Sequence, residues 1–431
     1  MIDIKLIREN PELIKENIKK KFQNNKLPLV EKIIKVDESW RNLKTEADKL
    51  RQKRNYVSKQ ISEAKKAKNE SQAQKLLKEA KLIPEEIRET EEKANKLEEE
   101  RNLLLSQIPN IINKNVPIGK DSTKNVEDKK FGKIPKVKFA PKNHVQLGEA
   151  LDVLDFDASA KTSGKGFYYL KKDLALLNQA IIRYGIDFMT KKCYSYIETP
   201  LMLRSSVMSN VTDLNDQKNQ IYKIENEDLY LIGTSEHSLI GRFIDTTINE
   251  SNLPIKNTSY SMCFRKEIGS HGIEEKGIFR THQFNKIEMI SICKPSDSMK
   301  IFEEMKKITI DIFKSMKIPI RVLKICSGDL GDLKHIQVDI EAWSPIKKEY
   351  YEVGSCSNLT DAQARKLKIR AIGRKGEKYV PHTLNNTAIA TSRALVAILE
   401  NNQTRDGQIK IPKVLQKYMS NKKLISPDKK K

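Results

Sequence analysis

Two apolar stripes with heptad spacing constrain the fold of this chain more than any other feature. They span residues 36–64 and 76–108, and the polar stretch KNESQ at 68–72 separates them. Apolar residues at alternating steps of four and three lie on one side of a helix, so two such helices joined by a short turn form an antiparallel coiled coil. Helices of about 35 residues, at about 1.5 Å per residue, predict a rod on the order of 50 Å long. Pro84 predicts a kink or a restart of the second helix.

Each stripe has a defined set of side chains that we expect at the helix–helix contact. The first stripe consists of Val36, Trp40, Leu43, Ala47, Leu50, Arg54, Val57, Ile61 and Ala64. The second consists of Leu76, Ala80, Ile83, Ile87, Thr90, Ala94, Leu97, Arg101, Leu104 and Ile108.

A two-stranded rod has no room for a catalytic pocket, so its role is to hold a partner. Dimerisation is the usual role of a coiled coil, whereas a basic tip favours a ligand that carries phosphates. Acidic residues such as Glu98, Glu99 and Glu100 gather towards the other end, and this segregation of charge favours a ligand at the tip. The candidate nucleic-acid contacts near the turn are Lys59, Lys65, Lys66, Lys68, Lys75 and Lys78.

The net charge of the chain supports a polyanionic partner. Its 431 residues, enough for two or three domains, carry 80 Lys and Arg against 57 Asp and Glu, a formal net charge of +23. This excess is larger than solubility requires. A general lysine bias of the source organism's proteins explains the excess equally well.

The cysteines and the absence of long apolar runs indicate a cytoplasmic protein. No CxxC pair and no histidine cluster with metal-ligand spacing occurs, so we expect buried free thiols in a reducing compartment. No apolar run is long enough to cross a membrane, and the amphipathic start of the chain mixes acids with bases, unlike a signal or transit peptide. The five cysteines are Cys193, Cys263, Cys293, Cys326 and Cys356.

The remaining sequence predicts an α+β domain with an antiparallel sheet flanked by helices. Helical spacing covers residues 173–191, and SRALVAILEN predicts a final helix. Strands are expected in YSYIETP, LYLI, SYSMCFR, NKIEMISI, HIQVDIEAW and EYYEVGS. Neither GxGxxG nor GKS/T occurs, so the sequence carries no motif that indicates a Rossmann fold or a P-loop. The predicted organisation is a helical domain at 1–108 with its coiled-coil arm at about 31–108, a linker at 109–144, a sheet domain at 145–420 and a basic tail at 421–431.

The stretch FRKEIGSHGIEEKGIFRTHQFNKIE, Phe264 to Glu288, predicts a long antiparallel hairpin around a glycine-containing loop. Because strand side chains alternate between faces, its charged and aromatic side chains share one face, while Ile287 and Met289 point into a core. A solvated face with cross-strand ion pairs is one interpretation. A phenylalanine among ions favours the other, a platform for a stacked base and its phosphates. The shared face comprises Cys263, Arg265 and Glu267, and then Arg280, His282, Phe284, Lys286 and Glu288.

Further motifs complete a resemblance to the seryl-tRNA synthetase family of class II aminoacyl-tRNA synthetases. FRKE with GSHG and GIFRTHQFNKIE resembles the second class II motif, LNNTAIATSRAL resembles the third, and the helix ending in YSYIETP resembles the first. GTSEH at 233–237 and SCSNLTDAQARK also match family positions, and the resemblance extends from MIDIKLIRENPE to ALVAILEN. It implies an N-terminal coiled-coil arm followed by a class II catalytic domain.

The resemblance implies activation of L-serine by ATP to seryl-adenylate, followed by transfer of the seryl group to the 3′-terminal ribose of tRNA(Ser). Charging of tRNA(Sec) is left open. Arg265 is implied to hold the α-phosphate and the serine carboxylate, Phe284 to stack on the adenine, and Arg393 to hold the far phosphate and cover the other face of the base. The implied ATP-binding set is Arg265, Lys266, Glu267, Thr281, His282, Gln283, Phe284, Glu352, Val353, Gly354, Ser355 and Arg393.

A metal ion and an amino-acid pocket follow from the same resemblance. Glu352 and Ser355 match positions that bind Mg²⁺, an ion that prefers oxygen ligands. Strict alternation puts these two side chains on opposite faces, so we expect a bulge or turn at Gly354. The family's catalytic residues correspond to Arg265, Glu352 and Arg393. The implied serine pocket consists of Thr234, Glu236, Arg265, Glu288, Asn385 and Thr387.

The resemblance also gives the arm a role, because in this family it grips the long variable arm of the tRNA across a homodimer. One departure concerns the loop HGIEEKG, where many relatives carry two arginines, so a contact of this loop with the tRNA acceptor end is in doubt. Two rival functions remain at this point. One is a catalytically inert RNA-binding adaptor, and the other is a paralogue that activates an amino acid for a carrier protein, which is expected to lack the arm.

Overall fold

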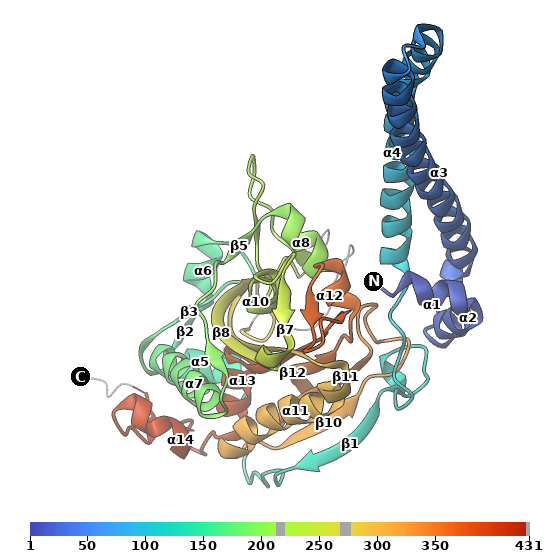
Figure 1. Ribbon diagram of the computed structural model, residues 1–431. Coiled ribbons are helices and arrows are strands. Elements are labelled where there is room, and N and C mark those ends of the chain that lie inside the picture. The colour runs from blue at the N-terminus through green and yellow to red at the C-terminus, as the bar shows by residue number, and fades with distance from the viewer. Residues whose placement is uncertain (213–219, 268–276, 428–431) are drawn as a thin grey trace. The chain divides into compact units, whose positions relative to one another are not determined.

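The computed structural model describes residues 1–212, 220–267 and 277–427, and these divide into two compact units (Figure 1). The arm unit is Met1–Pro109 and the sheet unit is Asn110–Lys431. The atypical loop HGIEEKG, apart from its last glycine, and the end of the basic tail lie outside the described residues. No helix in the described ranges is long and apolar enough to cross a membrane.

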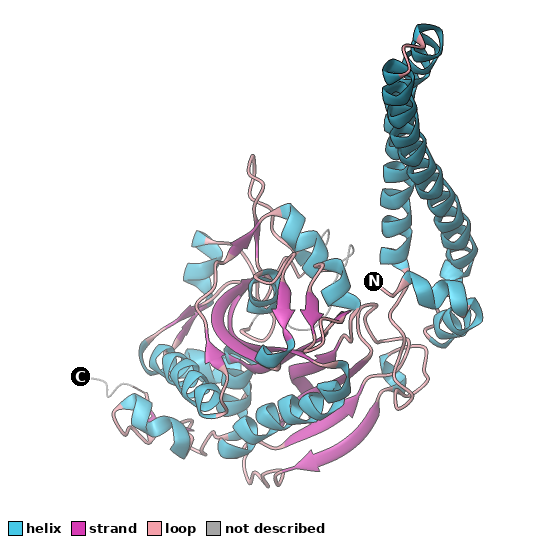
Figure 2. Cartoon of the chain, viewed as in Figure 1, coloured by secondary structure: helices cyan, strands magenta, loops and turns pink. Residues whose placement is uncertain are grey.

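The arm unit is an antiparallel pair of long helices, as the heptad stripes predict (Figure 2). Short helices α1 (Ile4–Glu9) and α2 (Pro11–Lys20) precede α3 (Leu27–Lys66), and α4 (Glu70–Gln107) returns alongside it. Asn69 caps α4, since its side chain accepts a hydrogen bond from the backbone N–H of Gln72 at 3.1 Å. Pro84 lies inside an uninterrupted α4, so the restart is wrong. Arg54 is exposed rather than at the contact, because a guanidinium reaches water from the edge of the seam.

A buried ion cluster holds the base of the arm and was not predicted from the sequence. The Asp37 side chain is only 1% exposed and receives two hydrogen bonds of 2.7 Å from the guanidinium of Arg8. Arg101 also reaches it, at 3.3 Å, while its guanidinium carbon lies 4.1 Å from the ring centroid of Trp40. Burial favours the neutral acid, but these arginines outweigh it and lower the pKa of Asp37. The heptad position of Arg101 is therefore an ion-pair site.

An eight-stranded sheet forms the centre of the sheet unit. Neighbouring strands are antiparallel except for the parallel edge pair β4 and β8. In order across the sheet the strands are β1 (Val126–Phe131), β10 (Ile320–Lys324), β11 (Ile336–Ser344), β12 (Glu349–Asn358), β15 (His382–Ala390), β9 (Gln283–Cys293), β8 (Ile255–Phe264) and β4 (Ser195–Tyr196).

Smaller sheets surround the main one. They pair β2 (Leu154–Asp155) with β3 (Tyr169–Leu170), β5 (Met202–Leu203) with β6 (Tyr230–Leu231), β16 (Ile409–Lys410) with β17 (Leu424–Ile425), and β13 (Arg370–Ile372) with β14 (Lys378–Tyr379) and β7 (Thr247–Asn249). The predicted LYLI strand therefore belongs to a separate small sheet.

Helices α7 (Lys172–Lys191), α11 (Ser298–Ser315) and α13 (Thr391–Asn401) cover one face of the sheet, while α10 (Ser235–Gly241) packs on part of the other face against β8 and β9, and the rest of that face carries polar side chains. In β11, Ile336, Val338 and Ile340 are buried in the main core with residues of α11 and α13, whereas the alternate residues are half-buried. This alternation gives the sheet an apolar and a polar face. The other helices are α5 (His144–Ala150), α6 (Phe156–Thr162), α8 (Ser205–Val211), α12 (Ala362–Lys366) and α14 (Lys413–Gln416).

Three expectations about the sheet unit need correction. The segment 109–144, predicted to be a linker, supplies edge strand β1, because its backbone pairs with β10. The tail at 421–431 contributes β17. Cys193 is exposed at the end of the turn that follows α7, while the other four cysteines are buried free thiols as expected.

Candidate functional site

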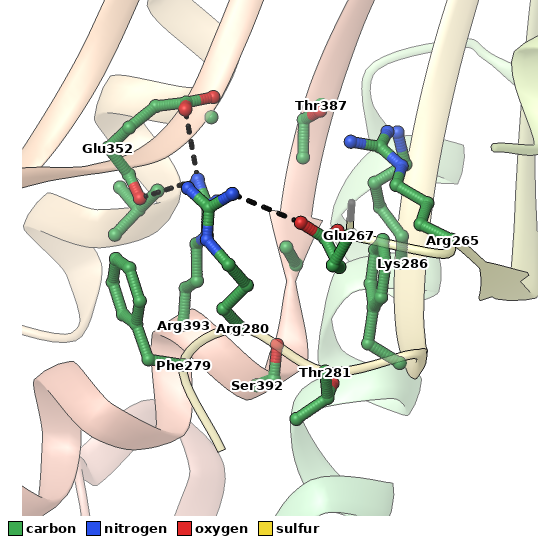
Figure 3. A pocket seen from close by; sticks show the side chains of 14 residues that line it. Arg265, Glu267, Phe279, Arg280, Thr281, Lys286, Glu352, Thr387, Ser392 and Arg393 are labelled. Carbon is green, nitrogen blue, oxygen red and sulfur yellow. Dashed lines mark hydrogen bonds and ion pairs between the residues drawn. The ribbon is translucent and has the colours of Figure 1, made fainter. Parts of the chain in front are cut away.

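The first pocket lies over the polar side of strands β9, β12 and β15 (Figure 3). Charged side chains and two phenylalanines face this pocket. One of its lining residues, Glu267, lies at a sharp backbone turn, where its φ is +49°. We call it the arginine pocket. It is lined by Arg265, Glu267, Phe279, Arg280, Thr281, Phe284, Lys286, Glu352, Val353, Gly354, Thr387, Ala390, Ser392 and Arg393.

The hairpin supplies one wall of the arginine pocket, although its regular pairing is shorter than predicted. Strands β8 and β9 pair from Ile255 opposite Ile292 to Phe264 opposite Gln283, and Arg265 follows the last ladder position. The side-chain Nε of Arg265 donates to the carbonyl of Gly233 at 3.2 Å, and its guanidinium carbon lies 5.5 Å from the Phe284 ring centroid. This arrangement holds a guanidinium beside an aromatic face.

Two further arginines bind carboxylates at the rim of the pocket (Figure 3). Arg280 contacts Glu267 at 3.1 Å, and Arg393 contacts both the carboxylate and the backbone carbonyl of Glu352 at 3.0 Å. The Arg393 guanidinium carbon lies 5.0 Å from the ring centroid of Phe279. Phe279 thus gives the pocket a second aromatic ring, which the sequence interpretation had not assigned.

The bulge expected at Gly354 is present one residue earlier, at Val353, and it gives Glu352 and Ser355 equivalent positions in the ladder. Glu341 lies opposite Glu352 and Asp339 lies opposite Ser355, with an irregularity at Val353 between them. Burial, together with the charge of Glu352, raises the pKa of Asp339 to about 7. Burial also acts against ionisation of Glu352, yet Arg393 and nearby cations lower the pKa of that carboxyl group. Paired oxygen side chains of this kind suit a hard divalent cation.

A second pocket adjoins the first, and Arg265 lines both. We call it the glutamate pocket, after Glu236. Its other walls come from the loop 331–334, from Leu359, and from Val211, Thr212, Gln220 and Ile221. The side chains from the motif GTSEH and from β15 that line it are Thr234, Glu236, His237 and Asn385.

Buried titratable groups set the electrostatics of the glutamate pocket. Thr234 caps α10 by accepting from the backbone N–H of Glu236 at 3.2 Å. Burial and the neighbouring Glu288 raise the pKa of Glu236, whose Oε1 accepts from the Gln363 amide at 3.0 Å. Burial and nearby cations lower the pKa of His237 to about 3, so its imidazole is neutral near pH 7. The pocket therefore presents a carboxyl group whose ionisation is disfavoured, beside a neutral imidazole.

The floor below the two pockets is a buried ion pair. Lys286 and Glu288 are 7% and 2% exposed, and their charged atoms lie 2.6 Å apart. Thr387 also donates to the same Glu288 oxygen at 3.2 Å. The polar face of β9 was expected to be accessible at Glu288, but the pairing with Lys286 and the packing of β15 bury it.

The structure brings most of the predicted site residues together. Those that line neither pocket are Lys266, His282, Gln283, Glu288 and Ser355. His282 is held at the side, where its Nδ1 lies 3.0 Å from the Arg265 carbonyl and 3.1 Å from the Tyr222 hydroxyl. The pocket residues that the sequence interpretation missed include Phe279, Ser392, His237 and Lys334. Phe279 and Ser392 lie within the sequence motifs quoted above, so these motifs could have identified them. Lys334 lies in no motif, and no pattern in the neighbouring sequence points to it.

All six candidate lysines of the arm are exposed around the turn between α3 and α4. Lys65 and Lys66 end α3, and Lys68 lies in the turn with a φ of +56°. Ion pairs between the two helices involve Lys53 and Arg51 instead, and within the described residues none of these six side chains lies in an ion pair. Their charges therefore remain available to a polyanion.

Comparisons with known proteins agree with this geometry over the full chain. The seryl-tRNA synthetase N-terminal domain model matches residues 1–112, and the tRNA synthetase class II core domain (G, H, P, S and T) model matches residues 221–402. The serine–tRNA ligase of Methanospirillum hungatei is 43% identical over 427 residues, covering 99% of this chain and 100% of that protein.

Two solved structures are similar over the whole chain. The seryl-tRNA synthetase from Pyrococcus horikoshii complexed with ATP has a TM-score of 0.93 and 40% identity, with 100% of both chains covered. The cytoplasmic serine–tRNA ligase from Naegleria fowleri in complex with AMP has a TM-score of 0.88 and 33% identity, covering 100% of this chain and 99% of that one.

Proposed function

The chain belongs to the seryl-tRNA synthetase family, and from this membership we infer that it is a serine–tRNA ligase. It activates L-serine with ATP to seryl-adenylate and then transfers the seryl group to the 3′-terminal ribose of tRNA(Ser). The observation that carries this inference is Arg265, which lines both pockets and so stands where a nucleotide and an amino acid meet. The inert-adaptor alternative has no support, because the predicted phosphate-binding and metal-binding residues are all present.

ATP occupies the arginine pocket in this proposal. Phe284 stacks on the adenine, Arg393 covers its other face and holds the far phosphate, and Glu267 lies on the adenine side. Support comes from the aromatic and guanidinium groups that line the pocket together. The similar structures from Pyrococcus horikoshii and Naegleria fowleri are complexes with ATP and AMP, which supports an adenine nucleotide as a ligand of this chain.

Serine occupies the glutamate pocket, where the Glu236 carboxyl group receives its ammonium group, whose positive charge favours the ionised carboxylate. Glu288 lies below the two pockets, paired with Lys286, and lines neither of them. Thr234 and Asn385 offer small polar groups to the serine hydroxyl. A pocket that hydrogen-bonds this hydroxyl discriminates strongly against alanine, because alanine leaves those groups unpaired. The support is the presence of Thr234, Glu236 and Asn385 along one wall.

The activation step needs charge stabilisation rather than a general base. The serine carboxylate is already a nucleophile, and its in-line attack on the α-phosphorus builds negative charge that Arg265 stabilises without reorganising. Glu352 and Ser355 are the residues that would hold Mg²⁺. Their fit rests on the bulge that aligns them and on the crowding of Asp339 with Glu352, since two neighbouring carboxyl groups favour a cation. When bound, Mg²⁺ supplies charge neutralisation at the ATP phosphates.

The arm unit serves as the tRNA grip in this proposal, and two copies of the chain form a homodimer in the cytoplasm. The exposed lysines at the α3–α4 turn provide a surface for backbone phosphates. In this proposal the boundary between the tRNA-binding domain and the catalytic domain lies after Pro109, where the two compact units divide. Sedimentation of the purified chain tests the dimer.

The decisive experiment is ATP–pyrophosphate exchange with serine, threonine and alanine in parallel, without tRNA. Exchange with serine alone is expected, and charging of tRNA(Ser) should follow when the tRNA is added. Absence of exchange with all three amino acids contradicts the proposed function and returns the adaptor to consideration. Exchange that favours threonine or alanine contradicts the assignment of the pocket to serine.

A further inference from the structure

Asn110 occupies an unusual position just after the arm unit ends. Its side chain is buried, with 5% of the residue exposed, although it stands in the segment that the sequence predicts to be a linker. The carboxamide nitrogen lies 3.1 Å from the carbonyl of Leu333, 2.8 Å from that of Leu359 and 3.0 Å from the Thr360 hydroxyl. A buried amide with this many partners fixes the backbone around it.

The partners of Asn110 belong to two separate walls of the glutamate pocket. Leu333 stands in the loop 331–334 and Leu359 follows β12, and both line the pocket. The backbone N–H of Asn110 also donates to the carbonyl of Asp332 at 2.7 Å. One residue from outside the pocket therefore ties two of its walls to each other.

Further hydrogen bonds keep the same segment against the loop. The backbone N–H of Asn113 donates to the carbonyl of His335 at 2.8 Å, and the His335 Nδ1 lies 2.6 Å from the carbonyl of Ile111. The His335 N–H in turn donates to Asn358 at 2.8 Å. These contacts set the orientation of the loop that carries Lys334 into the pocket.

The second wall leads to the carboxylate at the centre of the pocket. The chain passes from Leu359 and Thr360 into α12, where the Gln363 side chain is buried and donates to Glu236. A displacement of the turn at Thr360 therefore moves the amide that orients Glu236. Small misplacements of positioning groups are known to have large effects on binding and rate.

We propose that Asn110 is a positioning residue of the amino-acid pocket, joining loop 331–334 to the Leu359–Thr360 turn so that Gln363 holds Glu236 in place. This inference rests on the proposed function, because it takes the glutamate pocket as the site of serine. Asn110 itself does not touch the substrate. Its effect is specific to serine, since the arginine pocket shares none of the segments that Asn110 binds.

The test measures pyrophosphate exchange by the full-length chain with Asn110→Ala and Asn110→Asp. The aspartate keeps the side-chain volume and the oxygen that accepts from the backbone N–H of Ile111, but it removes the amide donor. Both variants therefore lose the hydrogen bonds to Leu333 and Leu359, and only the alanine also loses the accepted bond. We expect the KM for serine to rise about tenfold in each, as for the loss of one or two buried hydrogen bonds. The KM for ATP should stay within about twofold of the unaltered chain, because the arginine pocket is untouched.

Asn401→Ala is the matched control. Its side chain also donates to two backbone carbonyls, those of Trp343 at 2.8 Å and Ala397 at 2.9 Å, and it lines neither pocket. The control should leave the KM for serine unchanged even where it lowers the melting temperature. Equal changes in both KM values, or the same change in the control, overturn the proposal in favour of a general structural role.

A milder variant keeps the test decisive if both Asn110 variants fail to fold. Thr360→Val removes one partner of the carboxamide at a half-buried position and preserves the side-chain shape. A higher KM for serine with an unchanged KM for ATP supports the proposal, and unchanged values of both overturn it. Failure of the proposed function is distinguishable, because the unaltered chain then shows no serine-dependent exchange at all.

Discussion

Replacing Arg265 with alanine tests the point at which the two pockets meet. The side chain lines both pockets, donates to the Gly233 carbonyl at 3.2 Å and lies 5.5 Å from the Phe284 ring. Its anchored guanidinium is therefore already in position when negative charge develops on the α-phosphate. Removing one such donor costs about 3–4 kcal/mol, or on the order of 10²–10³ in rate. Because Arg265 is proposed to hold both the phosphate and the serine carboxylate, we expect the upper end of that range.

The assay is serine-dependent ATP–pyrophosphate exchange, with kcat and both KM values measured separately. Arg265→Lys should recover only part of the loss, since a lysine keeps the charge but cannot bind Gly233 and two anionic oxygens with a planar fork. Arg321→Ala is the control, because Arg321 is also half-buried and paired with Glu341 but lines neither pocket.

Binding of tRNA should be nearly unchanged in Arg265→Ala, since the arm unit is intact. Exchange at an unreduced rate in this variant refutes the assignment of Arg265 to the transition state. An equal loss in Arg321→Ala refutes it as well, because the effect is then one of general stability.

Three more predictions concern the arm, its base and the metal. Changing Lys65, Lys66 and Lys68 at the arm's turn to alanine should lower the slope of log affinity for tRNA(Ser) against log salt concentration by about 2–3. The control changes three exposed lysines of the sheet unit, Lys133, Lys136 and Lys138, and should leave the slope unchanged. Equal slopes in the two triple variants would leave the arm a structural role. Asp37→Asn should lower the free energy of unfolding of the arm unit by about 2–3 kcal/mol, because it removes the buried charge shared by Arg8, Arg41 and Arg101 and leaves Arg101 only its 3.6 Å contact with Glu98. A shift below about 1 kcal/mol in urea titration would contradict this. Folding lowers the pKa of Asp37 from its usual 3.8, so the contribution of Asp37 to the free energy of unfolding is fully present above that pH. This contribution disappears as the pH falls through the lower folded-state pKa. Acid titration of the unaltered chain and of Asp37→Asn measures the difference. Chelation of Mg²⁺ should stop exchange, and Glu352→Gln should raise the Mg²⁺ concentration for half-maximal exchange by at least about tenfold; an unchanged requirement argues against Glu352 as a ligand.

Periodic patterns account for the features that the sequence predicted well. The heptad stripes of the arm and the helical spacing of 173–191 correspond closely to α3, α4 and α7. The alternation in HIQVDIEAW likewise corresponds to β11. These patterns are local, because a helix or a strand with one apolar face must bury that face whatever its partner is. The family resemblance then supplied the candidate site residues.

Errors arose where long-range pairing overrides local composition. Residues 126–131 are mostly polar and, apart from Phe131, exposed, and they were predicted to be part of a linker. They form β1 because strand β10 offers its unpaired backbone edge. Glu288 looked accessible from its place in the hairpin, but β15 covers it and Lys286 neutralises it. In both cases the strand that pairs with the segment, β10 or β15, lies about a hundred residues or more away in the chain.

The sequence by itself determined the helical arm, the type of sheet and the residues that carry the proposed chemistry, since each depends on local periodicity or on a motif. Tertiary structure alone decided that Arg265 is shared by two pockets, and it placed the bulge that the sequence predicted at Val353 rather than at Gly354. It also decided that Asn110, in a segment without any periodic pattern, joins two walls of the glutamate pocket. The physical reason is that hydrogen bonds and burial between distant segments depend on three-dimensional proximity, which side-chain periodicity along the chain does not encode.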